Sequence, residues 1–300
     1  MSTDTYVFPD VMSPRDHAKQ RAHRTKEAAR MKILIVGGSG FLGTALVPLA
    51  IEAGHEVTVT GRGAARPPHL PDAAGYLQWS TKEPLRAPGP YDAVMNLAGA
   101  NIVGSRWTAS YKEKLRRSRI ETNERLVLWC GEQEVKPKVF HTSSAVGYYG
   151  LSPEEPVDED APPDDDFLAR LCRDWEDSAR AAEAYGARVV ATRQGIILDT
   201  GGGALDKMML PFKLGLGGRV GSGDQPFPWI HRTDAAWALL FCIENEALEG
   251  PVNVVAPQVI TNEEFTKAFG DALHRPTIFP VPEFGLELVY GEGAGVLTSG

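Results

Sequence analysis

The stretch that decides the fold is residues 32–63, KILIVGGSGFLGTALVPLAIEAGHEVTVTGRG. KILIV (32–36) is almost entirely aliphatic, which is typical of a strand buried on both faces of a sheet. FLGTALVPLAIEAG (41–54) predicts a helix that ends at a glycine, and HEVTVTGR (55–62) predicts a second strand. A strand, a helix and a strand in this order form a βαβ unit, so we expect a parallel sheet.

The alternation continues beyond this unit. Further strands are predicted at 76–80, 91–99, 137–144 and 188–194, with helical patterns at 110–133 and 167–185 between them. This order predicts an α/β protein with a Rossmann fold, a doubly wound parallel sheet covered by helices on both faces. From about residue 200 the chain is richer in glycine and proline, with helices expected at 233–245 and 262–273. We expect a smaller, substrate-covering C-terminal domain there.

These patterns divide the chain into three segments. Residues 1–30 are basic and have no apolar face, which favours a disordered extension, with a short basic interaction arm as the alternative. Residues 31–255 are assigned to the dinucleotide-binding domain and 256–300 to the small C-terminal domain.

Composition limits the classes of partner. The chain has 300 residues and a net charge of −8 at pH 7, and no basic stripe that would neutralise the phosphates of a nucleic acid. Its three cysteines lack the spacing of a zinc site or a disulfide framework, so we expect a reducing cytoplasm and no metal. No apolar run approaches the roughly 20 residues of a membrane span. A small-molecule substrate is the expected partner.

The glycine-rich turn GGSGFLG predicts a cofactor site, because it lies between a strand and a helix. Gly37 allows the tight turn, Gly40 lets a pyrophosphate approach the backbone, and Gly43 lets helix and strand pack closely. The amides at the helix N-terminus then bind the diphosphate. The predicted cofactor-binding residues of this turn are Gly37, Gly38, Ser39, Gly40, Phe41, Leu42 and Gly43.

The end of the second strand indicates which dinucleotide binds. An NAD site has a carboxylate there, whereas this strand ends at Arg62, with Arg66 a few residues later. A guanidinium can bind a 2′-phosphate through two hydrogen bonds. We therefore expect NADP(H), with Arg62 as the contact and Arg66 either a second contact or an ordinary solvated charge.

The order of NLAG (96–99), SSAVGYYG (143–150), GGGALDKMMLPFKLGLGG and GSGDQPFPWIH after the glycine turn resembles the extended short-chain dehydrogenases/reductases. More narrowly, the chain resembles their atypical YfcH-type branch, the "epimerase family" proteins with a C-terminal domain of unknown function. The resemblance implies a Rossmann fold, NADP(H) and an unassigned substrate. It also implies relatives that continue for roughly twenty more residues, so we expect a truncated or rebuilt C-terminus, with apolar surface around Leu286–Tyr290 that favours a homodimer.

The resemblance also assigns roles to individual residues. Asn96, Leu97, Ala98 and Gly99 would line the adenosine half of the cofactor, and Arg193 would lie near the nicotinamide, unless it forms a structural salt bridge at its strand end.

Ser144, or less favourably Ser143, would point at the reacting oxygen of the substrate. Either serine is otherwise simply a turn former.

One feature of the family is missing. Its Tyr-x-x-x-Lys pair is followed by a Glu that Glu176 matches, which places Leu168 at the Tyr and Cys172 at the Lys. Leucine cannot relay a proton, and we expect Cys172 to be buried in the helix. Tyr149 is the substitute proton donor that we expect, with Tyr148 as the alternative. Arg106, Lys112 or Arg119 could supply the missing cation, unless they form a solvated helix face.

Another family feature is missing as well. Phe227 stands where sugar-nucleotide epimerases have an arginine that grips the diphosphate, so such a substrate is not expected.

Two functions therefore remain open. The first is an NADP(H)-dependent oxidoreductase or epimerase that uses Ser144 and an unusual proton donor. The second is a non-catalytic NADP(H)-binding regulatory protein, for which the resemblance suggests a link to cell division. The intact glycine turn fits both, the missing Tyr and Lys favour the second, and the retained serines favour the first.

Overall fold

The structure is a computed structural model that describes residues 29–150, 156–281, 284, 288 and 291–298. Nearly all of the predicted N-terminal extension, and most of the apolar segment expected around Leu286–Tyr290, lie outside the described residues. Within the described residues, no helix combines the length and the apolar composition that crossing a bilayer requires.

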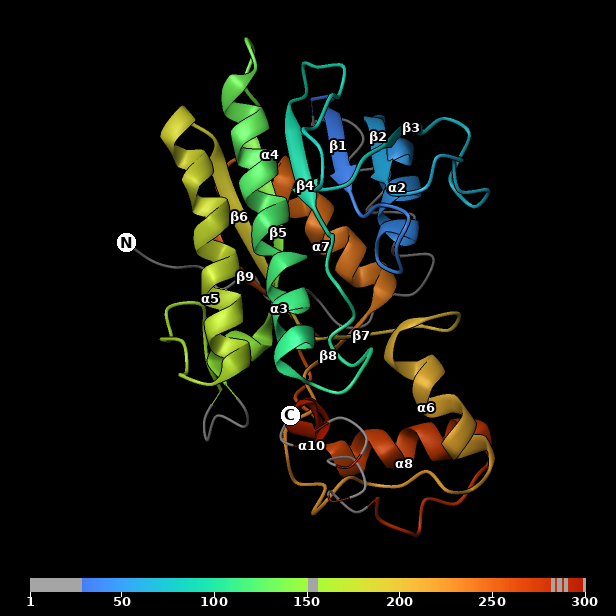
Figure 1. Cartoon of the computed structure of the whole chain (residues 1–300). Helices are drawn as coiled ribbons and strands as arrows, with labels where there is room; N and C mark the ends of the chain where they lie inside the picture. The colour runs from blue at the N-terminus through green and yellow to red at the C-terminus, as the bar shows by residue number, and fades with distance from the viewer. Residues whose placement is uncertain (1–28, 151–155, 282–283, 285–287, 289–290, 299–300) are drawn as a thin grey trace.

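One parallel sheet forms the centre of the molecule, and it confirms the predicted Rossmann fold (Figure 1). Its seven strands, counted over the described residues, run in the order β3-β2-β1-β4-β5-β6-β9. Their bounds are β1 (Lys32–Val36), β2 (Glu56–Gly61), β3 (Gly75–Gln78), β4 (Ala93–Asn96), β5 (Val139–Ala145), β6 (Arg188–Gln194) and β9 (Gly250–Val254). The order reverses direction at β1 and β4, and ligands of such sheets bind beyond the carboxyl ends of the strands at this point.

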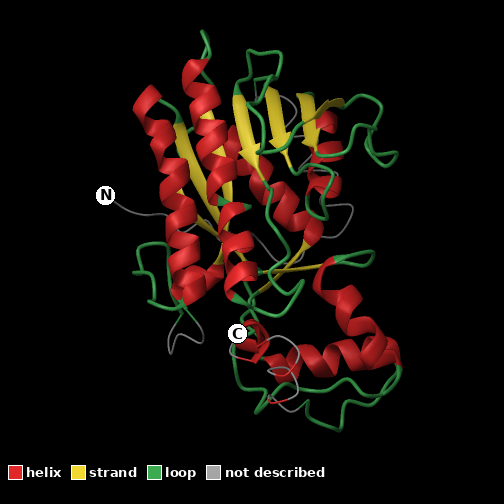
Figure 2. Ribbon diagram, viewed as in Figure 1, coloured by secondary structure: helices red, strands yellow, loops and turns green. Residues whose placement is uncertain are grey.

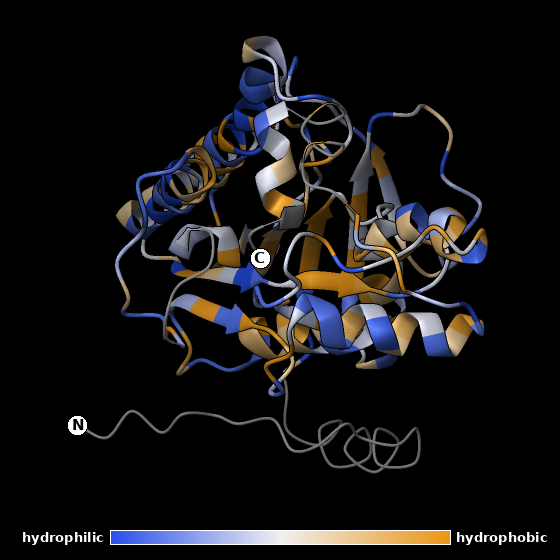
Figure 3. Ribbon diagram, turned by 90° about the horizontal axis from the view of Figure 1, so that it is seen from below, coloured by the Kyte–Doolittle hydropathy of each residue, from blue (hydrophilic) through white to orange (hydrophobic). Residues whose placement is uncertain are grey.

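Helices cover both faces of the sheet (Figure 2). On one face, α2 (Gly43–Glu52) and α7 (Arg232–Glu244) bury an aliphatic cluster against β1 and β2. On the other face, α4 (Ile120–Glu132) and α5 (Phe167–Arg180) bury a second cluster that contains Leu126 and Phe140. β1 and β4 are apolar except for one end residue each, whereas the covering helices carry both kinds of residue (Figure 3). Burial on both faces explains why the strands show no polar alternation.

The helical pattern predicted at 110–133 is two helices, so the prediction of one continuous helix is wrong. α3 (Ala109–Arg117) ends before Ser118, and α4 begins at Ile120. The side chains at the junction bond to the loop that follows β4: Ser118 Oγ accepts from Ala100 N at 2.9 Å, and Arg119 Nη2 donates to Ala100 O at 3.0 Å. These bonds hold the break in place.

A smaller second part lies beyond the carboxyl ends of the strands, around α6 (Gly203–Lys213) and α8 (Asn262–Leu273) (Figure 1). A separate pair of strands, β7 (Ile196–Leu198) and β8 (Trp229–His231), connects it to the sheet. Its core is a buried cluster in which Leu198 and Phe227 pack with Phe265. The second part therefore draws on residues 196–231 as well as on the predicted segment 256–300.

Short helices complete the described chain. They are the 3-10 helices η1 (Val146–Tyr149), η2 (Ala181–Tyr185) and η3 (Gly291–Ala294), and the one-turn helix α10 (Gly295–Thr298).

Candidate functional site

The glycine turn joins β1 to α2 at the point where the strand order reverses. Gly37 has φ +82°, and a Cβ at this position would lie 2.9 Å from Ala98 N in the loop after β4. Gly43 is equally constrained, because its Cβ would lie 2.4 Å from Gly38 O. A side chain at Gly40 would meet only Gly37 O, at 3.2 Å. Gly37 and Gly43 therefore serve packing, whereas Gly40 keeps the backbone open to a ligand.

The start of α2 suits a diphosphate. The amides of Phe41, Leu42 and Gly43 donate to no acceptor among the described residues, and the first turn of α2 contains no acidic side chain. Such amides, with the positive end of the helix dipole, bind phosphate groups. The turn therefore fits the predicted dinucleotide, with Gly40 at the closest approach.

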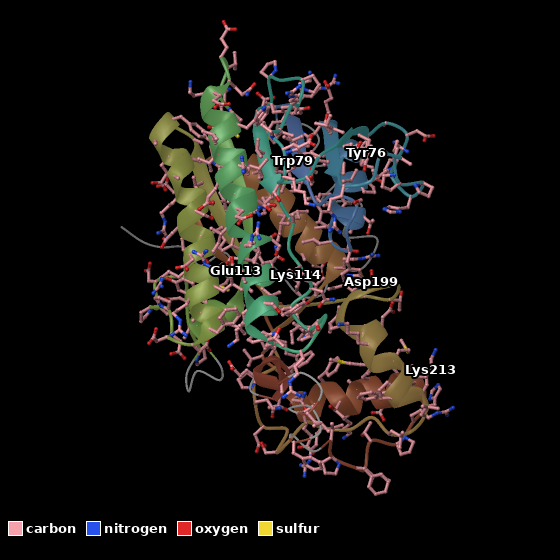
Figure 4. All side chains as sticks on the ribbon, viewed as in Figure 1. Tyr76, Trp79, Glu113, Lys114, Asp199 and Lys213 are labelled. Carbon is pink, nitrogen blue, oxygen red and sulfur yellow. The ribbon has the colours of Figure 1, made fainter. Side chains whose placement is uncertain are left out.

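Phe41 links this turn to the second part of the molecule. A Cβ on Gly202 or on Gly203 would lie 2.7 Å from the Phe41 ring, so these two glycines pack directly on it. The guanidinium of Arg232 lies over the same ring, with Cζ 4.9 Å from the ring centre. Its Nη2 forms an ion pair with Asp199 Oδ2 at 2.7 Å. Figure 4 labels Asp199 between α2 and α6. We call this contact the Phe41 clasp.

Arg62 and Arg66 differ in what they contact. Arg66 donates to the carbonyls of Leu70 and Pro71 and so stabilises its own loop. The Arg62 side chain is exposed directly after β2, and its guanidinium bonds to no described residue. Arg62 is the arginine whose guanidinium is available to a 2′-phosphate.

The loop after β4 is shaped by Asn96. Its Nδ2 donates to Asn123 Oδ1 at 2.7 Å, and its Oδ1 accepts from Ala98 N at 2.9 Å. Of the predicted residues Asn96, Leu97, Ala98 and Gly99, Leu97 and Ala98 lie directly beside Gly37 of the glycine turn.

A buried ion pair lies at the ends of β5 and β6. Arg193 and Glu176 are each 2% exposed, and Arg193 donates to Glu176 through Nε at 3.0 Å and Nη2 at 2.9 Å. Burial alone would lower the pKa of Arg193, but the hydrogen bonds to Glu176 outweigh it and raise the pKa. Ser144 Oγ also donates to Glu176, at 2.6 Å. Arg193 was expected either near the nicotinamide or in a structural salt bridge, and this geometry shows the salt bridge.

Tyr149 belongs to the same network. Its hydroxyl accepts from Arg193 Nη1 at 2.9 Å and donates to Asn253 Oδ1 at 2.7 Å. Burial raises the pKa of Tyr149, and Arg193 offsets part of that rise. The Tyr148 ring lies against the Arg193 guanidinium, 3.5 Å from Cζ to the ring centre. The hydroxyl of Tyr149 therefore already has a donor and an acceptor within the protein.

The two serines lie on opposite faces of β5. Ser144 bonds to Glu176 on α5, whereas Ser143 Oγ accepts from Gln194 Nε2 at 3.1 Å. Residues that follow one another in a strand point to opposite faces, so the two hydroxyls cannot meet at one atom. The sequence identified Ser144, Tyr149 and Arg193, which the structure brings together, but it gave no sign of Asn253 or Gln194 as their partners.

The helix positions of the missing Tyr and Lys are apolar. Leu168 packs with the cluster around Trp107 and Trp175. Cys172 is 3% exposed, as expected, and burial first, then the nearby Glu176, raises the pKa of its thiol to about 12. Neither side chain can transfer a proton near neutral pH.

The family follows from the sequence match. Residues 33–256 match the NAD dependent epimerase/dehydratase family. The chain belongs to this family. Among curated relatives, the epimerase family protein SDR39U1 of Bos taurus is 39% identical over 271 residues, which cover 89% of each chain. The epimerase family protein Mb2239 of Mycobacterium bovis is 39% identical over 269 residues, covering 89% of this chain and 87% of that protein.

Solved structures include a relative of the same name with a similar fold. The crystal structure of human SDR39U1 (isoform 2) with NADPH has a TM-score of 0.80 and 38% identity over 90% of both chains. The predicted cofactor thus agrees with the one named for that relative. A UDP-glucose 4-epimerase of Thermotoga maritima has a TM-score of 0.70 at 20% identity, which shows the shared fold alone.

Phe227 occupies the position at which an arginine was expected in a diphosphate-binding site. The side chain is buried, and its ring stacks on Phe265 at 4.1 Å with an interplanar angle of 14°. Phe227 therefore forms part of the core of the second part. Arg219, which lies nearby in the sequence, is exposed and forms an ion pair of 3.3 Å with Glu263.

Proposed function

We propose that this chain is an NADP(H)-dependent oxidoreductase or epimerase that acts on a small molecule. The observation that carries the proposal is the glycine turn, in which Gly40 is open and the amides of Phe41, Leu42 and Gly43 have no described acceptor. The NADPH named for human SDR39U1 supports the same cofactor. The buried ring of Phe227 argues against a nucleotide-diphosphate-sugar as the substrate.

Arg62 sets the cofactor preference in this proposal. A charge-assisted hydrogen bond to the 2′-phosphate gives NADPH an advantage over NADH of about 2–3 kcal/mol. Titration of both cofactors into the wild type and into Arg62→Glu tests this, with Arg180→Glu, an exposed arginine at the end of α5, as a control for the charge change. Equal affinities of the wild type for NADPH and NADH would refute the assignment.

Bound cofactor would supply or accept a hydride, and the chain must then hold the substrate oxygen and move its proton. Ser144 is the proposed residue that binds the reacting oxygen of the substrate, because its hydroxyl lies at the carboxyl end of β5 and is oriented by Glu176. Tyr149 is the proposed proton source: burial raises the pKa of its phenol, and the Arg193 guanidinium that donates to its hydroxyl offsets part of that rise.

A second candidate function is a non-catalytic NADP(H)-binding protein that regulates a partner. The observation in its favour is that the polar atoms near the missing Tyr and Lys are already paired: Ser144 with Glu176, and Tyr149 with Arg193 and Asn253. Leu168 and Cys172 offer no replacement.

One experiment separates the two functions. The protein is loaded with NADPH, and the absorbance of the bound cofactor is followed while a panel of aldehydes and ketones is added. The oxidoreductase proposal expects oxidation that falls about 10²–10⁴-fold in Ser144→Ala. Ser143→Ala, on the opposite face of β5, is the matched control and keeps the rate. Tight NADPH binding without oxidation by any carbonyl would favour the regulatory function.

A further inference from the structure

Arg119 is a buried cation without a carboxylate partner among the described residues. It is 9% exposed, and its guanidinium donates from Nη1 to Leu115 O at 3.1 Å and to Ser118 Oγ at 3.4 Å, and from Nη2 to Ala100 O at 3.0 Å. Its Cζ lies 5.0 Å from the centre of the Trp175 ring. Arg193, the other strongly buried arginine, is neutralised by Glu176. Burial lowers the pKa of Arg119, as expected for a charge that lacks a counter-ion.

The position of Arg119 connects the glycine turn to α5. A Cβ on Gly99 would lie 3.2 Å from Arg119 Cζ, so the guanidinium lies directly against the loop after β4. One residue earlier, the same loop packs against Gly37 of the turn through Ala98. On its other side, Arg119 is close enough to Cys172 to interact electrostatically with the thiol. A dinucleotide that starts at the glycine turn and extends along the carboxyl edge toward β5 would pass this guanidinium.

The hydrogen bonds of Arg119 leave donors unused. A guanidinium has five N–H groups, and no described residue accepts from the Arg119 Nε. An unpaired buried charge is strongly unfavourable, so a site of this kind is stabilised by a ligand that brings acceptor oxygens. The sugar and phosphate oxygens of a dinucleotide are such acceptors.

We propose that Arg119 binds the nicotinamide-side ribose and phosphate of bound NADP(H), and that it supplies the positive charge that position 172 lacks in this chain. The inference rests on the proposed NADP(H) function. It also accounts for Cys172: its thiol interacts electrostatically with the Arg119 guanidinium in a buried region, so a lysine ammonium at position 172 would add a second positive charge that Arg119 repels. A single cation is therefore sufficient at this place, and in this chain it is Arg119, at the junction of α3 and α4, and not a lysine at position 172.

Binding of two ligands tests the proposal. NADPH contains the nicotinamide half, whereas adenosine 2′,5′-bisphosphate lacks it. In Arg119→Met, the affinity for NADPH should fall about 10- to 100-fold, the effect of losing a charge-assisted hydrogen bond, while the affinity for the bisphosphate stays within about twofold. Arg119→Lys keeps the charge but not the fork of donors, and it should lose less NADPH affinity than Arg119→Met.

Arg188 is the matched control. It also donates to backbone carbonyls, Cys242 O at 3.0 Å and Ile243 O at 2.8 Å, but it lies at the amino end of β6, away from the cofactor edge. Arg188→Met should bind both ligands as the wild type does, and thermal melting of each variant verifies the fold.

The outcomes are distinct. A wild type that binds no NADPH refutes the proposed function. A wild type that binds NADPH while Arg119→Met loses nothing, or loses both ligands equally, refutes the role of Arg119 alone.

A charge exchange provides the second measurement. Cys172→Lys should weaken NADPH binding in the wild-type background and restore it, in part, in the Arg119→Met background. Additive effects of the two substitutions would contradict a shared charge site.

Discussion

Replacing Glu176 with glutamine should destabilise the protein strongly, because Arg193 would keep its charge in a buried position without a counter-ion. The two residues are each 2% exposed, and Glu176 accepts two bonds from Arg193 and one from Ser144. Removing one partner of a buried ion pair costs about 3–5 kcal/mol. Glutamine retains one acceptor oxygen, so we expect about 3 kcal/mol, or roughly 6–12 °C in Tm for a chain of this size. Urea and thermal unfolding at neutral pH measure both values.

Two further variants make this test specific. Glu121→Gln removes the same charge from an exposed pair with Arg117, 2.7 Å long, and should change the stability by no more than about 0.5 kcal/mol. The double variant Glu176→Leu with Arg193→Met removes both buried charges and should recover much of the loss. A Glu176→Gln protein within about 1 kcal/mol of the wild type would refute the view that this pair is a buried, water-excluded contact.

Three other predictions concern glycines, a cysteine and a histidine. Gly43→Ala should prevent folding, since its Cβ would overlap Gly38 O, whereas Gly40→Ala should fold and lose NADPH affinity; circular dichroism and cofactor titration distinguish them. Cys172, with a pKa near 12, should resist iodoacetamide at pH 8 until the protein unfolds, and rapid labelling of the native protein would contradict its burial. Burial lowers the pKa of His141 to about 3, so the unfolded chain binds a proton below pH 6.5 that the native protein does not; stability should fall by roughly 3 kcal/mol from pH 7 to pH 4, and His141→Gln should reduce that fall in urea unfolding.

The sheet was predictable because its signals are local. β1 is a short apolar run, and the glycine turn lies between it and α2. The break at Ser118 was not predictable, since the apolar spacing continues across it and the bonds that fix it come from Ala100. The second part combines segments that are distant in the sequence, because α6 and the β7–β8 pair belong to it although β9 returns to the sheet after them.

The candidate site shows the same limit. Ser144, Tyr149 and Arg193 stand out in the sequence by their motifs, but their hydrogen-bond partners depend on how β5 faces α5 and how β9 pairs with β6. The burial of Phe227 depends on Phe265, which is distant in the sequence. Such contacts are set by tertiary packing, which no local pattern encodes.

The Phe41 clasp has a thermodynamic consequence for how the molecule handles two ligands. The Phe41 ring belongs to the diphosphate turn, yet it is the surface on which Gly202 and Gly203 of the second part rest, and Arg232 and Asp199 close the same contact. A dinucleotide that fixes Phe41 therefore also fixes the glycines before and at the start of α6. If the dinucleotide strengthens the binding of a second molecule that orders residues 201–203, that molecule must strengthen dinucleotide binding by the same factor. This reciprocity can be measured: Phe41→Ala should leave each ligand able to bind alone while the cooperativity between them disappears.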